Sequence, residues 1–106
     1  MRIYVAGPYT KPNPEKNTER AIFYGDWLKA LGFSVYIPHL SHFWDKQIPH
    51  EFEFWMEHDF EWLEVCDAVF RFDGESSGAD REVAWAKEHG LPVYYTITEI
   101  PRPLSK

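Results

Sequence analysis

The chain has only one cysteine among its 106 residues and no long apolar run. A single thiol, Cys66, cannot form an internal disulfide, which is typical of proteins from reducing compartments. No apolar stretch approaches the roughly 20 residues that a membrane-spanning helix needs. Residues 1–3 lead directly into strand-like sequence instead of a signal peptide. We therefore expect a soluble, cytoplasmic protein with no membrane partner.

Basic residues are also scarce in this sequence. Lys and Arg number 11 against 17 Asp and Glu, so the formal net charge is −6 at pH 7. Binding to long nucleic acid needs a basic face, so this balance argues against such a partner but leaves room for a small anionic ligand. There are no internal repeats, and the length predicts a single domain, residues 1–106. The aromatic content of 18% favours a folded chain and makes a homodimer the expected assembly.

Short apolar segments alternate along the chain with segments of helical periodicity. The pattern predicts strands at residues 3–6, 33–37, 68–72 and 91–95, and helices from Asn17 or Thr18 to 31, from about 51 to 65, and from Ser76 or Ser77 to about 90. Residues 39–50 are predicted to form an irregular loop. The alternation predicts an α/β fold, a flavodoxin- or Rossmann-like three-layer sandwich with a four-stranded parallel sheet in the order 2-1-3-4.

The segment between the third strand and the last helix carries the main functional motif, Ser76-x-Gly78-x-x-x-Glu82. Glycines permit tight backbone geometry there, serine caps the helix, and the N–H groups of the first helical turn form an anion site. The carboxylate of Glu82 follows one turn later, as a potential nucleophile or base. In the predicted sheet order this motif shares one cleft with Gly7, Pro8 and Tyr9, at the carboxyl ends of the strands.

Three features together resemble the nucleoside 2-deoxyribosyltransferase superfamily. They are the run Tyr4-Val5-Ala6-Gly7-Pro8-Tyr9, the placement of Asp59 eight residues before Asp67, and the motif that ends at Glu82. The similarity extends from the first predicted strand to the fourth. Within this superfamily the chain is most similar to a small branch near the 2′-deoxynucleoside 5′-monophosphate N-hydrolases.

The resemblance implies roles for individual residues. Glu82 would attack the anomeric carbon of the sugar and form a covalent glycosyl-enzyme, and Asp59 would act as acid and base toward the nucleobase. Tyr9, or Tyr4 in the strand, would orient Glu82 or line the sugar pocket. The remaining expected substrate contacts are Gly7, Pro8, His39, Ser76, Ser77 and Gly78. The expected ligand is a small nucleoside or nucleotide, and no cofactor is expected.

The chain departs from the transferases at two points. Where they commonly have an aspartate, six residues before the nucleophile, this chain has Ser76, as the monophosphate hydrolases do. Serine with helix N–H groups suits a phosphate, so a 5′-nucleotide is favoured over a free nucleoside. The sequence after the fourth predicted strand is short, so a fifth strand is not expected. Residues 96–106 either complete a neighbouring active site or cover the sheet edge.

Simpler interpretations stay open at this point. Glu82 is alternatively a solvated carboxylate paired with Arg81 or Lys87. Asp59 is alternatively one of several acidic residues on a solvent-exposed helix face. The alternative function is a nucleotide-binding or sensing module without turnover. A third possibility is a metal-dependent hydrolase, because His39, His42, Asp45, His50 and His58 are concentrated in one region and include zinc-ligand types. None of these has the spacing of a helical zinc motif, so we expect no metal site and interpret the histidines as structural or base-contacting residues.

Overall fold

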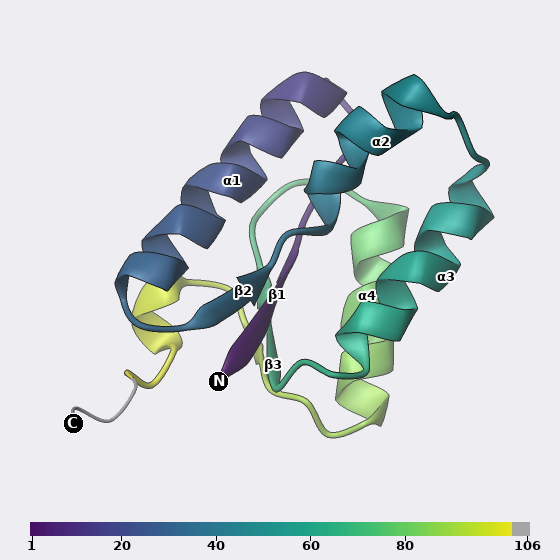
Figure 1. The fold of residues 1–106 in the computed structure, drawn as a ribbon. Coiled ribbons are helices and arrows are strands. Elements are labelled where there is room, and N and C mark those ends of the chain that lie inside the picture. Colours follow the sequence, from purple (N-terminus) through teal and green to yellow (C-terminus); the bar gives the residue numbers. More distant parts are fainter. Residues whose placement is uncertain (103–106) are drawn as a thin grey trace.

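The computed structural model describes residues 1–102 of the chain. Its strands are β1 (Arg2–Ala6), β2 (Ser34–Tyr36), β3 (Ala68–Arg71) and β4 (Val93–Tyr94), and its helices are α1 (Pro14–Ala30), α2 (Ser41–Gln47), α3 (Phe52–Leu63) and α4 (Ser77–Glu88). Two single-turn 3-10 helices, η1 (Pro38–Leu40) and η2 (Ile97–Glu99), complete the elements (Figure 1).

All four strands of this sheet run parallel, in the order β2-β1-β3-β4, which confirms the predicted topology. In the register, Ile3 pairs with Val35 on one side and with Ala68 on the other. The central strands β1 and β3 are therefore buried on both faces, and β3 is buried along its whole length. β1 and β3 are neighbours in this order. After β1 the chain continues to β2 on one side of the sheet, and after β3 it continues to β4 on the other side. Parallel sheets bind their ligands at the carboxyl ends of two such strands.

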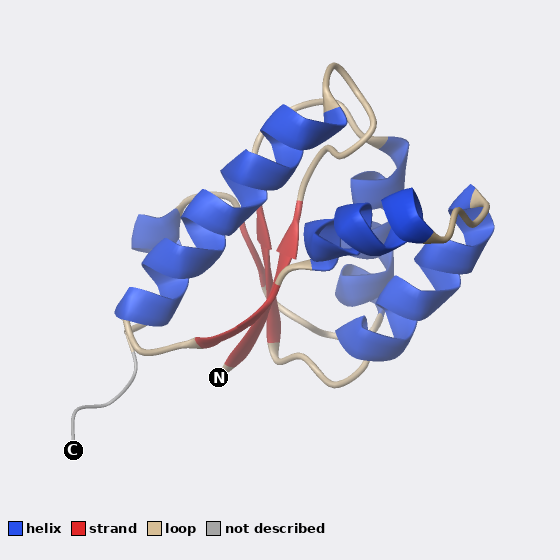
Figure 2. Ribbon diagram, turned by 45° about the horizontal axis from the view of Figure 1, so that its top comes forward, coloured by secondary structure: helices blue, strands red, loops and turns tan. Residues whose placement is uncertain are grey.

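Helices cover both faces of the sheet, so the protein has three layers (Figure 2). On one face, α1 contributes Ala21 and Leu28 to a core with alternate β1 residues. On the other face, α3 and α4 contribute Leu63 and Ala86. Because strand side chains alternate between faces, Tyr4 faces the layer of α3 and α4, opposite to its neighbours in β1.

Helix α1 begins earlier than the sequence pattern predicted. The proposed caps Asn17 and Thr18 are wrong, because Asn13 is the N-cap and its side chain accepts a hydrogen bond from the backbone N–H of Lys16. Pro14 then occupies the first turn, where its missing N–H costs nothing. Asn17 is instead buried inside the helix and donates to two carbonyls of the preceding loop, at 2.8 and 2.9 Å. Its role is to hold the loop that follows β1.

The predicted irregular loop at residues 39–50 is largely helical, so that prediction is wrong. It contains η1 and α2. The sequence pattern did not predict a helix here because the usual burial is reversed. The polar side chain of His42 is buried, whereas the apolar side chains of Phe43 and Trp44 are 59% and 44% exposed. A seven-residue helix is too short to form on its own propensity, so contacts with the rest of the fold determine it.

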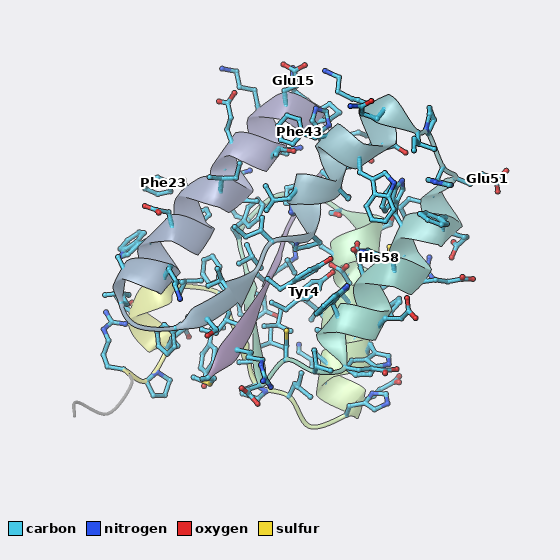
Figure 3. The ribbon with its side chains drawn as sticks, viewed as in Figure 1. Tyr4, Glu15, Phe23, Phe43, Glu51 and His58 are labelled. Carbon is cyan, nitrogen blue, oxygen red and sulfur yellow. The ribbon has the colours of Figure 1, made fainter. Side chains whose placement is uncertain are left out.

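Large side chains remain on the surface of these helices. Phe23 and Phe43 point outward, while Tyr4 lies in the interior (Figure 3). The homodimer expected from the aromatic content stays a prediction. None of the helices within residues 1–102 combines the length and apolar character that crossing a membrane requires.

The segment after β4 packs on the sheet. Ile97 and Ile100 are 4% and 2% exposed and belong to the core on the α1 side. In the described part of the chain no fifth strand follows β4. The last four residues of the predicted tail, 103–106, lie outside the described range.

Candidate functional site

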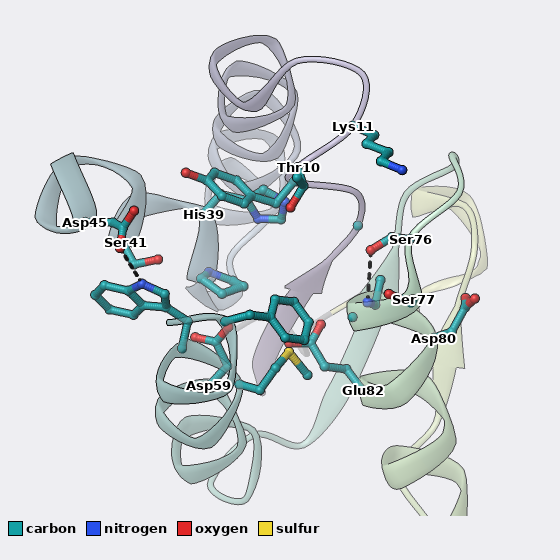
Figure 4. A pocket seen from close by; sticks show the side chains of 18 of the residues that line it. Thr10, Lys11, His39, Ser41, Asp45, Asp59, Ser76, Ser77, Asp80 and Glu82 are labelled. Carbon is teal, nitrogen blue, oxygen red and sulfur yellow. Dashed lines mark hydrogen bonds between the residues drawn. The ribbon is translucent and has the colours of Figure 1, made fainter. Parts of the chain in front are cut away.

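A cavity of about 730 Å³ opens at the carboxyl ends of β1 and β3. Its wall is built by the loop after β1, by η1 and α2, by the first turns of α3, and by the start of α4 (Figure 4). The polar and charged residues of this wall are Tyr9, Thr10, Lys11, His39, Ser41, Asp45, His50, Asp59, Glu75, Ser76, Ser77, Asp80 and Glu82. The cavity therefore brings together residues from segments that are far apart in the sequence.

Glu82 is a buried carboxyl group that faces this cavity. It is 5% exposed, and its Oε2 accepts a hydrogen bond of 2.5 Å from the hydroxyl of Tyr4, which is fully buried in β1. Burial raises the pKa of Glu82 to about 7, although the Tyr4 hydrogen bond and the charges of Arg71 and Arg81 oppose the shift. The alternative of a solvated carboxylate paired with Arg81 does not hold, because Arg81 pairs with Glu53 at 2.9 Å.

Asp59 is the second buried carboxyl group of the cavity. It is 9% exposed, while the other acidic residues of α3 lie on the surface. Its Oδ1 is buried and has no hydrogen-bond partner among the described residues. Burial, and then the charge of Glu82, raise the pKa of Asp59 to about 8. Tyr4 donates a hydrogen bond to Glu82, whereas Oδ1 of Asp59 receives none within residues 1–102, so the surroundings favour the carboxylate form of Glu82 over that of Asp59.

These raised pKa values predict that the protein loses stability as the pH rises. The pKa of Asp59 is higher in the folded chain, about 8, than its ordinary value of 3.8, so folding binds a proton. The resulting stabilisation is complete below the ordinary value and is lost as the pH rises through 8. We expect Asp59→Asn to show a smaller loss of unfolding free energy than wild type between pH 6 and pH 9, by on the order of 3 kcal/mol.

Urea unfolding at the two pH values measures this difference. Glu57→Gln, an exposed acidic residue on the same helix, is the matched control and should follow wild type. Parallel pH dependence in wild type and Asp59→Asn would contradict a raised pKa.

The start of α4 forms one end of the cavity. Ser76 is the N-cap, and its Oγ accepts a hydrogen bond of 3.1 Å from the backbone N–H of Ala79. The first-turn residues Ser77 and Gly78 line the cavity, and Lys11 lies on the same side of it (Figure 4). Lys11 forms no ion pair with any residue in the range 1–102. Helix N–H groups and an ammonium group without an ion pair within residues 1–102, on the same side of one cavity, favour an anionic ligand.

The loop that delivers Ser76 is held by a buried arginine. Arg71, 8% exposed, donates to the carbonyl of Phe72 and, at 2.7 Å, to that of Gly74, and it lies 3.5 Å from Asp80. Gly74 has φ of +124°, and an added Cβ there would lie 2.8 Å from a side-chain carbon of Pro8. Only glycine fits this position without strain. The loops after β1 and β3 therefore lock against each other.

Two tyrosines were candidates to orient Glu82, and the structure separates them. The hydroxyl of Tyr4 bonds to Glu82, while the hydroxyl of Tyr9 lies 2.7 Å from Nδ1 of His42. Tyr9 lines the cavity and also places its ring edge against His39, with 6.0 Å between centroids. The proposed contact between Tyr9 and Glu82 is thus replaced by a contact with His42.

His39 lines the cavity with a ring whose protonated nitrogen is fixed by a hydrogen bond. Its Nε2 lies 2.9 Å from the carbonyl oxygen of Pro8, so Nε2 carries the proton. Nδ1 is then an acceptor, and it is buried without a hydrogen-bond partner in the described chain. Burial lowers the pKa of His39 to about 4, so the ring is neutral at physiological pH.

The other predicted contacts divide into two groups. Gly7, Ser76, Ser77 and Gly78 line the cavity, whereas Tyr4 and Pro8 are fully buried and lie outside its wall. Tyr4 acts on the cavity through its hydrogen bond to Glu82, and the direct contact of Tyr4 and Pro8 with a substrate stays a prediction. An added Cβ at Gly7 would lie 2.2 Å from the ring of Phe72, so close packing explains this glycine.

Sequence reasoning did not assign a functional role to several residues of the wall. Phe52 and Met56 line the cavity, and Phe52 is 51% exposed there. Asp45 was considered only as a metal ligand, yet it accepts hydrogen bonds from Trp55 and from the backbone of His50. Within residues 1–102, no three His, Cys, Asp or Glu side chains are grouped closely enough to hold a metal ion.

Comparisons with known proteins complement this geometry. A family described as "Domain of unknown function (DUF7768)" matches residues 1–96. A solved structure of the 2-deoxyribosyltransferase from the psychrotolerant bacterium Bacillus psychrosaccharolyticus is similar, with a TM-score of 0.62 and 25% sequence identity over 88% of this chain and 69% of that chain. No curated protein sequence matches the chain significantly. The structural neighbour supports a distant relationship to the deoxyribosyltransferases and makes an enzymatic activity plausible.

Proposed function

Since the chain belongs to the DUF7768 family, whose function is not defined, we propose from its site that it cleaves or transfers the N-glycosidic bond of a deoxynucleoside 5′-monophosphate or nucleoside. One observation carries this proposal: a buried carboxyl group, Glu82, is held by Tyr4 at 2.5 Å in a cavity that also contains the buried carboxyl group of Asp59. The similarity to a 2-deoxyribosyltransferase supports the reaction class.

The first step divides the work between the two carboxyl groups. The Glu82 carboxylate attacks C1′ of the sugar and forms a C–O bond, while the C1′–N bond breaks and its electron pair passes to the base. The proton of Asp59 neutralises the departing base. Burial supports both roles, because it keeps Asp59 protonated near neutral pH while Glu82 is more acidic.

The second step releases the sugar. Water or a second base attacks C1′, the ester bond to Glu82 breaks, and the Asp59 carboxylate accepts the proton of the attacking group. Glu82 returns to its anionic form, so the cycle needs no further reactant. Hydrolysis and transfer differ only in the acceptor that enters the cavity.

Base release from a panel of substrates tests the proposal directly. The purified protein is incubated with 2′-deoxynucleosides and their 5′-monophosphates, with and without a free acceptor base, and released base is quantified by liquid chromatography. We expect base release, faster with the monophosphates. If no base is released under either condition while a nucleotide still raises the melting temperature, the protein is a nucleotide-binding module and not an enzyme.

Lys11 offers a test of the phosphate end of the cavity. Because Lys11 lines the same cavity as Ser76 and the first turn of α4 and lies on their side of it in Figure 4, we propose that it binds the 5′-phosphate. We expect Lys11→Ala to raise KM for 5′-monophosphates by roughly 10- to 100-fold, the loss of one charge-assisted hydrogen bond, with little change for nucleosides. Lys16→Ala, on the exposed first turn of α1, is the control. An equal effect of Lys11→Ala on both substrate classes would remove the phosphate assignment.

A further inference from the structure

Asp45 presents an oriented carboxylate in the wall of the cavity. It lies in the last turn of α2, and its Oδ1 accepts a hydrogen bond of 2.7 Å from Nε1 of Trp55 and one of 2.9 Å from the backbone N–H of His50. Within residues 1–102, nothing donates to its Oδ2. The two bonds to one oxygen therefore fix the carboxylate and leave the other oxygen available to a ligand.

The partner that orients Asp45 is itself firmly placed. The indole ring of Trp55 makes edge contacts with Trp44 and Phe54, with 4.9 and 4.8 Å between ring centroids. Trp55 lines the cavity together with Asp45 and Ser41. A carboxylate held this way needs little reorganisation to bind a ligand, which favours selectivity.

The position of Asp45 relative to the two buried carboxyl groups indicates which part of a bound nucleotide it contacts. Figure 4 shows Asp45 and Ser41 at one end of the cavity and Ser76, Ser77 and Lys11 at the other, with Asp59 and Glu82 between them. Asp59 lies on the Asp45 side of Glu82. A nucleotide with its phosphate near Ser76 and its sugar at Glu82 therefore extends its base past Asp59 toward Asp45.

We propose that Asp45 selects nucleobases that carry an exocyclic amino group, with its Oδ2 accepting a hydrogen bond from that group. This inference rests on the proposed function and names the substrate class within it. An ionised carboxylate accepts hydrogen bonds and donates none. A base with a keto oxygen in place of the amino group would set that oxygen against Oδ2 of Asp45, and two acceptors cannot form a hydrogen bond with each other. The hydroxyl of Ser41 both donates and accepts, so it does not discriminate between the two kinds of base.

The charge state of Asp45 agrees with this role. Hydrogen bonds from the backbone of His50 and from Trp55 lower the pKa of Asp45, so the group is ionised at neutral pH. Because Asp45 remains partly open to solvent, we expect moderate selectivity, roughly 10- to 100-fold between matched bases, instead of the larger factors of fully enclosed sites.

The variant Asp45→Asn tests the inference sharply. Asparagine keeps an oxygen for Trp55 and His50 and replaces Oδ2 by an amide that donates. Two pairs of 5′-monophosphates that differ at the exocyclic group, dCMP with dUMP and dAMP with dIMP, are compared by kcat/KM for base release. Binding of the same four nucleotides is measured by calorimetry in the Glu82→Gln background. We expect wild type to prefer the amino member of each pair, and Asp45→Asn to abolish or reverse this preference.

The outcomes separate this inference from the proposed function. If base is released but the members of each pair are equivalent, or if Asp45→Asn leaves the ratios unchanged, Asp45 does not select the base although the reaction class stands. If no base is released but the binding ratios follow the prediction, the inference stands and catalysis falls. If no nucleotide binds, both fail. Trp55→Phe, which removes one bond to Oδ1 and keeps the carboxylate, should reduce the preference, and it decides the question if Asp45→Asn does not fold.

Discussion

Replacing Glu82 by glutamine is expected to lower base release by at least about 10³-fold and to leave the fold intact. Glutamine has nearly the same shape, and its amide oxygen accepts the hydrogen bond that Tyr4 donates at 2.5 Å. The amide, however, is a poor nucleophile and cannot form the ester with C1′. The loss should therefore appear in kcat, while binding of the nucleotide is retained.

Intact-protein mass spectrometry adds a direct observation to this kinetic test. Wild type quenched during turnover should carry the mass of the sugar or sugar phosphate, and Glu82→Gln should not. Glu88→Gln, an exposed residue at the end of the same helix, controls for a general effect on α4. Undiminished base release by Glu82→Gln would exclude the covalent route. If the variant changes only nucleotide affinity and neither protein releases base, the site is a binding site.

The topology of the protein was predictable because its signals are local. Buried β-branched and aromatic runs, interrupted by helical periodicity, determine an alternating order, and parallel strands with crossover helices leave few possible arrangements. The order 2-1-3-4 follows, and the structure confirms it. That order alone explains why Gly7, Tyr9, Ser76 and Glu82 reach one cavity from distant parts of the chain.

Other features depend on contacts that no local pattern encodes. Helix α2 was missed because its buried face carries His42, bonded to Tyr9 from another segment, while its aromatic residues face outward. Arg71 was read as part of an apolar strand, although its guanidinium group reaches the loop that presents Ser76. A lone arginine in a buried strand is a signal of such a role, because a charge is buried only where acceptors satisfy it. Asp45 gave no comparable signal, because its hydrogen-bond partner Trp55 lies on the next helix, α3, and no local pattern connects the two residues.

Asp59→Asn is expected to lower base release by roughly 10²- to 10⁴-fold for natural nucleobases, the usual contribution of a positioned proton donor. Natural bases leave poorly as anions, so they depend on the proton of Asp59. A substrate with an electron-poor leaving group that departs as a stable anion needs no proton and should lose far less. A uniform loss for both kinds of leaving group would show that Asp59 only maintains the shape of the cavity.

The pH dependence gives a second signature of the same role. In wild type, kcat/KM should rise as Glu82 loses its proton and fall as Asp59 loses its proton, and both limbs should lie at higher pH than ordinary carboxyl groups titrate, because burial raises both pKa values. In Asp59→Asn the falling limb should disappear, while the rising limb of Glu82 remains. Glu57→Gln on the same helix should keep both limbs. Because the neutral asparagine also removes a buried charge, the variant should be less active yet more stable than wild type at pH 9, a combination that a merely damaged fold does not produce.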